Sequence, residues 1–453
     1  MGILSPYPLG GSGFVLDDQG GLLGLVHDVS KTFLETSQLR IGLFVHLDMP
    51  WMDHPFLTSS FKIRTQKQLD ALRQLRLAKI RIDPGRSDPP AAGSSPAKDA
   101  EAVAEEPPLI EEMREHLAEA LWEEKRQRIE ALKQRRSRLN QCSKRYTKSV
   151  GSARKLMSQL RSSPMQAVEA ASDLVTQMVD DLTADCEATV QLVNLKHQDE
   201  NSYYHCVNVA ALAMVIGQQL SLDKSQLRLL GMGALFHDLG HQKIPTQILL
   251  KKEAFNSPER KFYEQHPRYG VEIARNLSAL PKPVVEIIAR HHEHLDGSGF
   301  PEGVKGGDIG MLTRIVTVVN RYDNLCNGFG ADRGMSPHQA ISHMYTSERQ
   351  CYDAKVLTTF ITNLGVYPPG TVVQLSDERV ALVVTINPQD LLKPNVLVYS
   401  PEIPQEEALI LDLAEEEVGI RESLHRTDLT QDQIEYLNLS DKLSYYFQSS
   451  GRR

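Results

Sequence analysis

The chain has 453 residues, a formal net charge of −8, 24% charged residues and 41% hydrophobic residues. This composition is ordinary for a globular protein with about three domains. No segment contains the roughly eighteen uninterrupted apolar residues of a membrane span, and the N-terminus lacks the basic and apolar regions of a signal peptide. The five cysteines have no Cys-x-x-Cys spacing. We therefore expect reduced thiols of a cytosolic protein that bind no metal.

Residues 1–90 are predicted to form a small α/β N-terminal domain. Residues 39–47 alternate between apolar and polar side chains as a strand would. Residues 66–77 have helical spacing, and residues 78–83 return as a strand. No catalytic constellation is visible in this domain, and its histidines are expected to have packing or surface roles.

Residues 91–164 are predicted to form a flexible linker followed by a long basic helix. Between residues 125 and 161 there are thirteen Lys or Arg residues and one acidic residue, a net charge of +12. Apolar residues recur there every seven positions, which favours helix pairing and a homodimer. They are Leu132, Leu139, Tyr146, Ala153 and Leu160. A nucleic-acid groove is the alternative, but one tyrosine is the single aromatic residue among the basic ones, so no DNA partner is expected.

Residues 165–370 contain five histidines and an aspartate that lie beside predicted helices. They are His205, His237, Asp238, His266, His291 and His292. Imidazole binds divalent ions, and a His-Asp pair can bind one ion through the ring while its carboxylate bridges to a second ion. A single histidine on an apolar helix is more often a packed core residue. Their recurrence favours a metal centre over that alternative.

Residues 371–453 are predicted to form a small β appendage and a C-terminal tail. Residues 370–384 have the pattern of a hairpin about a polar turn, and short apolar runs at 396–399 and 408–413 indicate further strands. Residues 428–453 are expected to form one more helix with a loose end. No chemistry is visible in this region.

The order and spacing of the histidine motifs resemble the HD-GYP family, a branch of the HD superfamily of metal phosphohydrolases that hydrolyses cyclic di-GMP in bacteria. The motifs are His205, His237-Asp238, His266-Pro-x-x-Gly270 and His291-His292-Glu293-x-x-Asp296-Gly-x-Gly-Phe-Pro301. The resemblance covers residues 165–370 and implies a mainly α fold with a helical HD-type catalytic domain. Residues 28–90 are similar to a small domain of unknown function that precedes some HD-GYP domains.

This resemblance implies a cyclic di-GMP phosphodiesterase that produces linear pGpG, and GMP after a second cut. It implies two divalent transition-metal ions, with iron or manganese favoured and zinc or nickel left open. The implied metal ligands are His205, His237, Asp238, His266, His291, His292 and Asn320. The implied catalytic residues are Asp238, His241 and Lys243, and the implied substrate contacts are Lys243, Gly299, Phe300, Pro301 and Arg333.

Several positions depart from the family pattern. His241 stands where the family has a lysine that contacts the phosphate, and a protonated His241 or the nearby Lys243 is expected to supply that charge. Asn320 stands where the family has its last metal-binding aspartate, so the ion on that side should be held less tightly. Asp323, one helical turn further on, is expected either to replace this ligand or to orient its neighbours.

Two further departures concern the metal count and the signature turn. Members with three metals carry a glutamate where this chain has Asn201, so two ions are expected. Phe300 replaces the tyrosine of the signature turn, which removes a hydroxyl group and keeps the ring.

Two other functions compete with the phosphodiesterase. The first is a catalytically weak sensor that binds cyclic di-GMP or a diguanylate cyclase (GGDEF) domain; Asn320 and His241 favour it, whereas the complete histidine set disfavours it. The second is hydrolysis of a different nucleotide, which the Gly-Phe-Pro turn disfavours.

Overall fold

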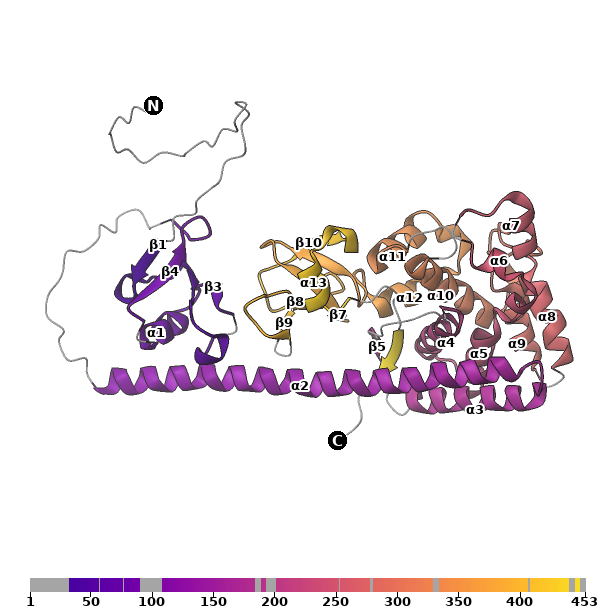
Figure 1. Cartoon of the computed structure of the whole chain (residues 1–453), viewed down its shortest axis with the longest axis horizontal. Helices are drawn as coiled ribbons and strands as arrows, with labels where there is room; N and C mark the ends of the chain where they lie inside the picture. Colours follow the sequence, from indigo (N-terminus) through magenta and orange to yellow (C-terminus); the bar gives the residue numbers. More distant parts are fainter. Residues whose placement is uncertain are drawn as a thin grey trace, which may run out of the picture. The chain divides into compact units, whose positions relative to one another are not determined.

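The structure is a computed structural model of the chain. It describes residues 32–56, 58–75, 77–89, 108–183, 189–192, 201–251, 253–277, 280–328, 334–405, 408–439 and 445–448. The chain divides into two compact units, Met1–Arg128 and Ile129–Arg453. A single long helix, α2 (Pro108–Gln159), passes from one unit into the other (Figure 1).

The first unit is built on a four-stranded antiparallel sheet. The strand order is β1 (Thr32–Glu35), β4 (Lys79–Asp83), β2 (Phe44–His46) and β3 (Ser60–Lys62). Helix α1 (Gln66–Gln74) is capped by the preceding Thr65, whose hydroxyl accepts a hydrogen bond from the backbone N–H of Gln68. Two short 3₁₀ turns, η1 (Thr36–Gln38) and η2 (Trp51–Asp53), complete the unit. The predicted α/β N-terminal domain is confirmed.

A buried lysine joins the start of α2 to this small domain. Lys125 is 2% exposed, and its ammonium group donates to the carbonyl oxygens of Trp51 at 2.5 Å and His54 at 2.7 Å. It also lies 3.8 Å from the centre of the Trp51 ring. The buried His54 contacts the hydroxyl of Ser59 at 3.1 Å. These polar groups therefore have packing roles.

The second unit is mainly helical. Its helices after α2 are α3 (Pro164–Thr183), α4 (Asn201–Gln219), α5 (Lys224–Phe236), α6 (Thr246–Leu249), α7 (Ser257–Tyr263), α8 (His266–Asn276), α9 (Lys282–Arg290), α10 (Met311–Asn327), α11 (Pro337–Thr346) and α12 (Ala354–Leu364). Short 3₁₀ segments join them at η3 (Leu239–Lys243), η4 (Gly306–Asp308) and η5 (Arg349–Cys351). The predicted mainly helical fold of this region is confirmed.

Helix α4 lies at the centre of this unit. Its residues Cys206–Ile216 are all buried, because α5, α10, α3 and α12 pack around it. Helix α5 begins with a capping box in which Asp223 and Gln226 accept each other's backbone N–H. The packing of these buried helices holds His205 on α4 and His237 at the end of α5 in fixed positions.

The seven-residue apolar pattern in α2 packs within its own chain. Tyr146, Ala153 and Leu160 are at most 5% exposed and belong to the core of the second unit. The side chains of Leu132 and Leu139 lie outside the described residues. The three described positions of the predicted dimer seam therefore pack within the chain. The homodimer remains a prediction.

The C-terminal region forms a second antiparallel sheet, as predicted. Its strand order is β10 (Ile420–Leu424), β6 (Val372–Leu375), β7 (Val380–Thr385), β8 (Asn395–Val398) and β9 (Ile410–Asp412). The predicted hairpin is β6 paired with β7.

The chain after this sheet differs from the expected single helix over 428–453. A 3₁₀ turn, η7 (Arg426–Asp428), and a short helix, α13 (Gln431–Tyr436), are followed by strand β11 (Tyr445–Gln448). β11 pairs with β5 (Thr189–Leu192) across a long sequence separation, which local periodicity cannot reveal. Among the described helices, none is both long and apolar enough to cross a membrane.

Candidate metal centre

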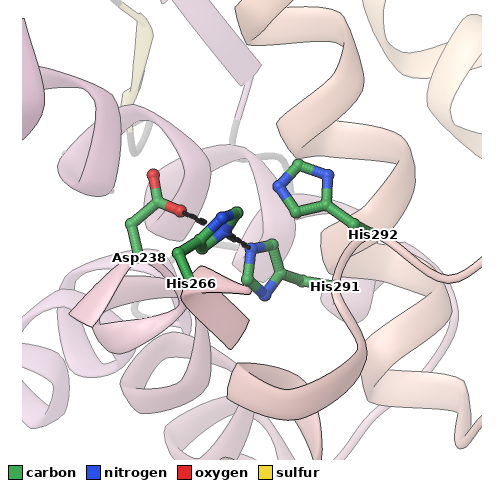
Figure 2. A group of neighbouring side chains, drawn as sticks. All are labelled: Asp238, His266, His291 and His292. Atoms are coloured by element: carbon green, nitrogen blue, oxygen red, sulfur yellow. Dashed lines mark hydrogen bonds and ion pairs between the residues drawn. The ribbon is translucent and has the colours of Figure 1, made fainter. Parts of the chain in front are cut away.

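The centre forms where several helices of the second unit end. His237 follows the last residue of α5, His266 begins α8, and His291 follows the last residue of α9. Figure 2 shows the rings of His266, His291 and His292 and the carboxylate of Asp238 turned toward one another. The structure thus brings together residues up to 87 positions apart, from His205 to His292.

One group of ligand atoms contains His266, His291, His292 and Asp238, all within 4.8 Å of one another. Asp238 Oδ1 lies 3.4 Å from His266 Nε2 and 3.5 Å from His291 Nε2. The two Nε2 atoms are 3.1 Å apart. The ring of His292 stacks on Phe300 with centroids 4.4 Å apart.

A second group contains His205, His237 and the same Asp238. Here the other carboxylate oxygen is used: Asp238 Oδ2 lies 3.6 Å from His205 Nε2 and 3.3 Å from His237 Nε2. The two Nε2 atoms are again 3.1 Å apart. Asp238 therefore faces one histidine group with each oxygen, as a bridging ligand would.

Backbone contacts determine which ring nitrogen of each histidine is free to bind. Nδ1 of His237 donates to Ala234 O at 2.6 Å, and Nδ1 of His266 donates to Tyr263 O at 2.9 Å. Nδ1 of His291 donates to Ile288 O at 3.1 Å. Because a carbonyl can only accept, each Nδ1 carries the proton and each Nε2 presents a lone pair.

This arrangement fits bound cations. Lone pairs of neighbouring Nε2 atoms face each other at 3.1 Å in both groups, and the buried Asp238 Oδ1 has no hydrogen-bond partner among the described atoms. Atoms held about 2.1 Å from one ion lie ~3.0 Å apart at right angles and ~3.4 Å apart at tetrahedral angles. The observed separations of 3.1–3.6 Å fall close to this range.

The protonation states of His291, His292 and Asp238 also suit metal ligation. Burial lowers the pKa of His291 to about 4 and holds the pKa of His292 well below its usual value. Burial opposes ionisation of Asp238, but the neighbouring His237 and His241 outweigh it and hold the pKa of this carboxyl well below its usual range. Neutral imidazoles and an ionised carboxylate are the forms that bind metals.

On α10, Asp323 lies behind His205 and orients its ring. Asp323 Oδ2 is 2.7 Å from His205 Nδ1, the nitrogen on the side of the ring away from His237. Its Oδ1 accepts from Asn208 at 2.9 Å and from Asn327 at 3.1 Å. Burial would lower the pKa of His205, but the hydrogen bond and charge of Asp323 outweigh it and raise it. Asp323 thus orients the ring of His205 in this structure.

Asn320 is buried close to the same ring. It is 2% exposed, interacts with the imidazole of His205, and accepts from Asn324 Nδ2 at 2.9 Å through its Oδ1. Its place one turn before Asp323 is compatible with a weak ligand, and that role remains a prediction.

The surroundings of His241 and Lys243 disfavour these two residues as the expected sources of positive charge. Burial lowers the pKa of His241 to about 3 despite the nearby Asp238, so this imidazole is neutral near pH 7. Lys243 is exposed, and its ammonium group pairs with the carboxylate of Glu272. Arg333 and the side chain of Asn201 lie outside the described residues.

The signature turn is held by a buried acid whose role the sequence did not reveal. Glu293 is 1% exposed and accepts three backbone N–H groups, from Glu302 at 2.7 Å, Gly303 at 3.2 Å and Val304 at 2.9 Å. A carboxylate in the middle of a histidine-rich motif was one available signal. Pro301, inside the turn, donates no backbone hydrogen bond.

Glycines allow the backbone to approach closely at two points of the centre. A Cβ at Gly240 would overlap the carbonyl oxygen of His266, so η3 and α8 can touch only with glycine there. A Cβ at Gly299 would overlap the backbone of His292 and His294. Both glycines therefore set the position of histidines in the centre.

Comparison with known proteins identifies the class. Residues 137–356 match the HD domain, and residues 32–171 match a domain of unknown function (DUF3391). The chain therefore contains an HD domain and carries a DUF3391 domain ahead of it.

Particular relatives share different parts of the chain. A Pseudomonas aeruginosa protein named cyclic di-GMP phosphodiesterase PA4108 is 29% identical over 371 residues, covering 81% of this chain and 84% of that protein. The 3'3'-cGAMP-specific phosphodiesterase 3 of Vibrio cholerae is 33% identical over 121 residues, covering 27% of this chain and 26% of that protein. The solved structure of Bd1817, an HDG"Y"P protein from Bdellovibrio bacteriovorus, covers 73% of this chain and 98% of that chain with 17% identity and a TM-score of 0.42.

Proposed function

We propose that this chain is a metal-dependent phosphodiesterase that hydrolyses cyclic di-GMP to linear pGpG. One observation carries the proposal: the carboxylate of Asp238 faces four Nε2 atoms, two from each histidine group, at 3.3–3.6 Å. Two-metal phosphodiesterases use a carboxylate placed in this way to hold both ions. The relative named cyclic di-GMP phosphodiesterase, which this chain matches over 84% of its length, supports the choice of substrate.

The residues suited to hold two ions are the two histidine groups with Asp238 between them, and Asn320 is a weaker candidate. Imidazole and carboxylate ligands suit iron or manganese, with zinc or nickel as the alternatives. Bound there, such ions would lower the pKa of the attacking water and would withdraw charge from the phosphoryl oxygens.

The chain itself fixes its ligands before any substrate arrives. Hydrogen bonds from Nδ1 to backbone carbonyls prevent the rings of His237, His266 and His291 from turning their lone pairs away. Phe300 supports the ring of His292 by stacking. Binding of the substrate therefore requires little rearrangement of these side chains.

We include Arg268 as a phosphate contact in place of His241 and Lys243. Arg268 is an exposed residue of α8, two positions after His266. Its Nη2 lies 3.4 Å from the carbonyl oxygen of Pro301, so its guanidinium group lies beside the signature turn. A guanidinium is charged at every relevant pH and binds phosphate in a forked geometry.

A catalytically weak sensor is the second candidate, because His241 is neutral and Lys243 is already paired. Such a sensor would bind cyclic di-GMP without turnover. Its partner, a diguanylate cyclase (GGDEF) domain, remains a prediction.

The deciding experiment is a timed hydrolysis assay on the full chain purified with iron or manganese. Cyclic di-GMP, 3'3'-cGAMP and cyclic di-AMP are supplied separately, and the products are separated by chromatography. We expect turnover of cyclic di-GMP to pGpG, with a loss of at least about 100-fold in Asp238→Asn. Asp180→Asn, a change at an exposed carboxylate paired with Lys224, is the matched control and should retain full rate.

Each of the other outcomes contradicts a different part of the proposal. Binding of cyclic di-GMP without turnover by fully metallated protein favours the sensor. Faster turnover of another cyclic dinucleotide rejects the substrate, and Asp238→Asn with an unchanged rate rejects the centre.

A further inference from the structure

We propose that His294, Asp296 and Cys351 form an additional metal site, which takes a thiophilic divalent ion such as zinc. The three residues each offer one ligand atom, and these atoms lie within 4.8 Å of one another. None of the three belongs to the two histidine groups that share Asp238. The proposal does not depend on the phosphodiesterase activity.

The distance between the thiol and the carboxylate matches tetrahedral zinc. Cys351 Sγ lies 3.7 Å from Asp296 Oδ2. With a zinc–sulfur distance of about 2.3 Å and a zinc–oxygen distance of about 2.1 Å, two ligands at a tetrahedral angle are ~3.6 Å apart.

Neighbouring groups already hold the ligands in position. The backbone N–H of Ser298 donates to Asp296 Oδ1 at 2.9 Å, which leaves Oδ2 directed at the sulfur. The backbone N–H of Leu295 donates to the Cys351 carbonyl at 2.9 Å and ties the two segments together. Metal ligands are usually oriented by such contacts.

The hydroxyl of Ser298 lies between the other two ligands. It is 2.9 Å from His294 Nδ1 and 4.0 Å from Cys351 Sγ. It can complete the coordination as the fourth ligand, or water can take that position because Asp296 is exposed.

The charge of the site balances a divalent cation. A thiolate and a carboxylate supply two negative charges, and the imidazole of His294 is neutral. The sulfur–hydrogen bond of Cys351 breaks as the sulfur–metal bond forms, and the proton goes to solvent.

An ion here would affect the neighbouring centre through the backbone. His294 and Asp296 lie in the loop that carries His292 and Phe300, whereas Cys351 ends η5. The ion would therefore join this loop to η5. Its removal should leave His292 less firmly placed.

Cobalt(II) provides a test because cobalt bound to thiolate absorbs strongly in the near ultraviolet. The described ligands of the histidine centre are nitrogen and oxygen atoms only, so this absorption would report the proposed site. We expect the full chain to develop the band as cobalt is added, and Cys351→Ser to lose the band and bind about one ion fewer.

Three further variants make the test specific. Cys206→Ser removes the thiol next to His205 and should retain the band, which excludes that sulfur as its source. Asp296→Asn, at an exposed position that should not disturb folding, should weaken cobalt binding. His237→Ala should lower the total cobalt content and keep the band. The proposal is overturned if wild-type protein with excess cobalt shows no band, or if Cys351→Ser keeps both the band and the full metal content.

Discussion

The two histidine groups share Asp238 but are built differently. His266, His291 and His292 come from helix ends, and two of them are oriented by backbone carbonyls. On the other side, His237 is also oriented by a backbone carbonyl, but His205 is oriented by the carboxylate of Asp323, and an uncharged amide, Asn320, lies next to it. Backbone-oriented ligands depend little on side-chain identity. Substitutions of the side chains next to His205 should therefore change the metal affinity of this centre.

The largest effect should follow from removing one ligand on either side. His266→Ala and His237→Ala should each lower turnover of cyclic di-GMP at least about 100-fold. Each variant lacks one imidazole ligand, so the ion held by that histidine group and by one oxygen of Asp238 is lost. Elemental analysis should show about one ion lost in each variant. Equal loss of all metal in both variants would mean that the two groups bind as one unit.

Asp323→Asn should have the next largest effect and should act on the His205 side. The amide can still contact His205 Nδ1 but no longer provides the negative charge that favours its N–H. We expect metal affinity to fall about 10- to 100-fold on this side, as measured by competition with a chelator. Retained affinity would show that Asn208 and Asn327 position the ring without the charge.

Asn320→Asp should strengthen the weaker side. A carboxylate next to His205 adds one negative charge, so metal affinity and turnover should rise by up to about tenfold. The measurement is metal content after limited chelation, together with the hydrolysis rate. If neither changes while Asp323→Asn abolishes both, Asp323 and not Asn320 determines metal binding on the His205 side, and that side is not the weaker one.

Lys243→Ala should change turnover by less than about twofold, because its ammonium group already pairs with Glu272 on an exposed surface. Arg268→Ala is the matched change at the proposed phosphate contact, and it should raise the KM for cyclic di-GMP. The opposite order of effects would restore Lys243 as the phosphate contact.

The smallest effect concerns pH. The pKa of His241 is lowered from 6.5 to about 3 by burial, so this ring gains a proton only as the pH falls toward 3. Between pH 6 and pH 8 it stays neutral, and His241→Gln should leave the shape of the rate profile unchanged even if the rate shifts. A loss of the alkaline limb in His241→Gln would show that the ring is protonated in the working enzyme.

The sequence predicts much of the centre because its motifs are dense in histidine and lie at helix ends. It could not show that His241 is buried or that Lys243 meets Glu272, because both depend on how η3 packs against α8. The heptad pattern in α2 predicts a dimer seam, but periodicity reveals an apolar face without revealing what covers it, and three of its positions pack within the chain. The cysteines were expected not to bind metal because they have no Cys-x-x-Cys spacing, and such local spacing cannot reveal the contact of Cys351 with Asp296, which is 55 residues away in the sequence.

Strand β11 has a practical consequence for anyone who shortens or tags this chain. β11 pairs with β5 and contacts α4, the helix that carries His205. A protein that ends at Leu439 would lack the partner strand of this two-stranded ribbon, and an isolated strand is not stable in water. Protease resistance and thermal stability should therefore be compared between full-length and shortened protein before any loss of rate is attributed to the metal centre.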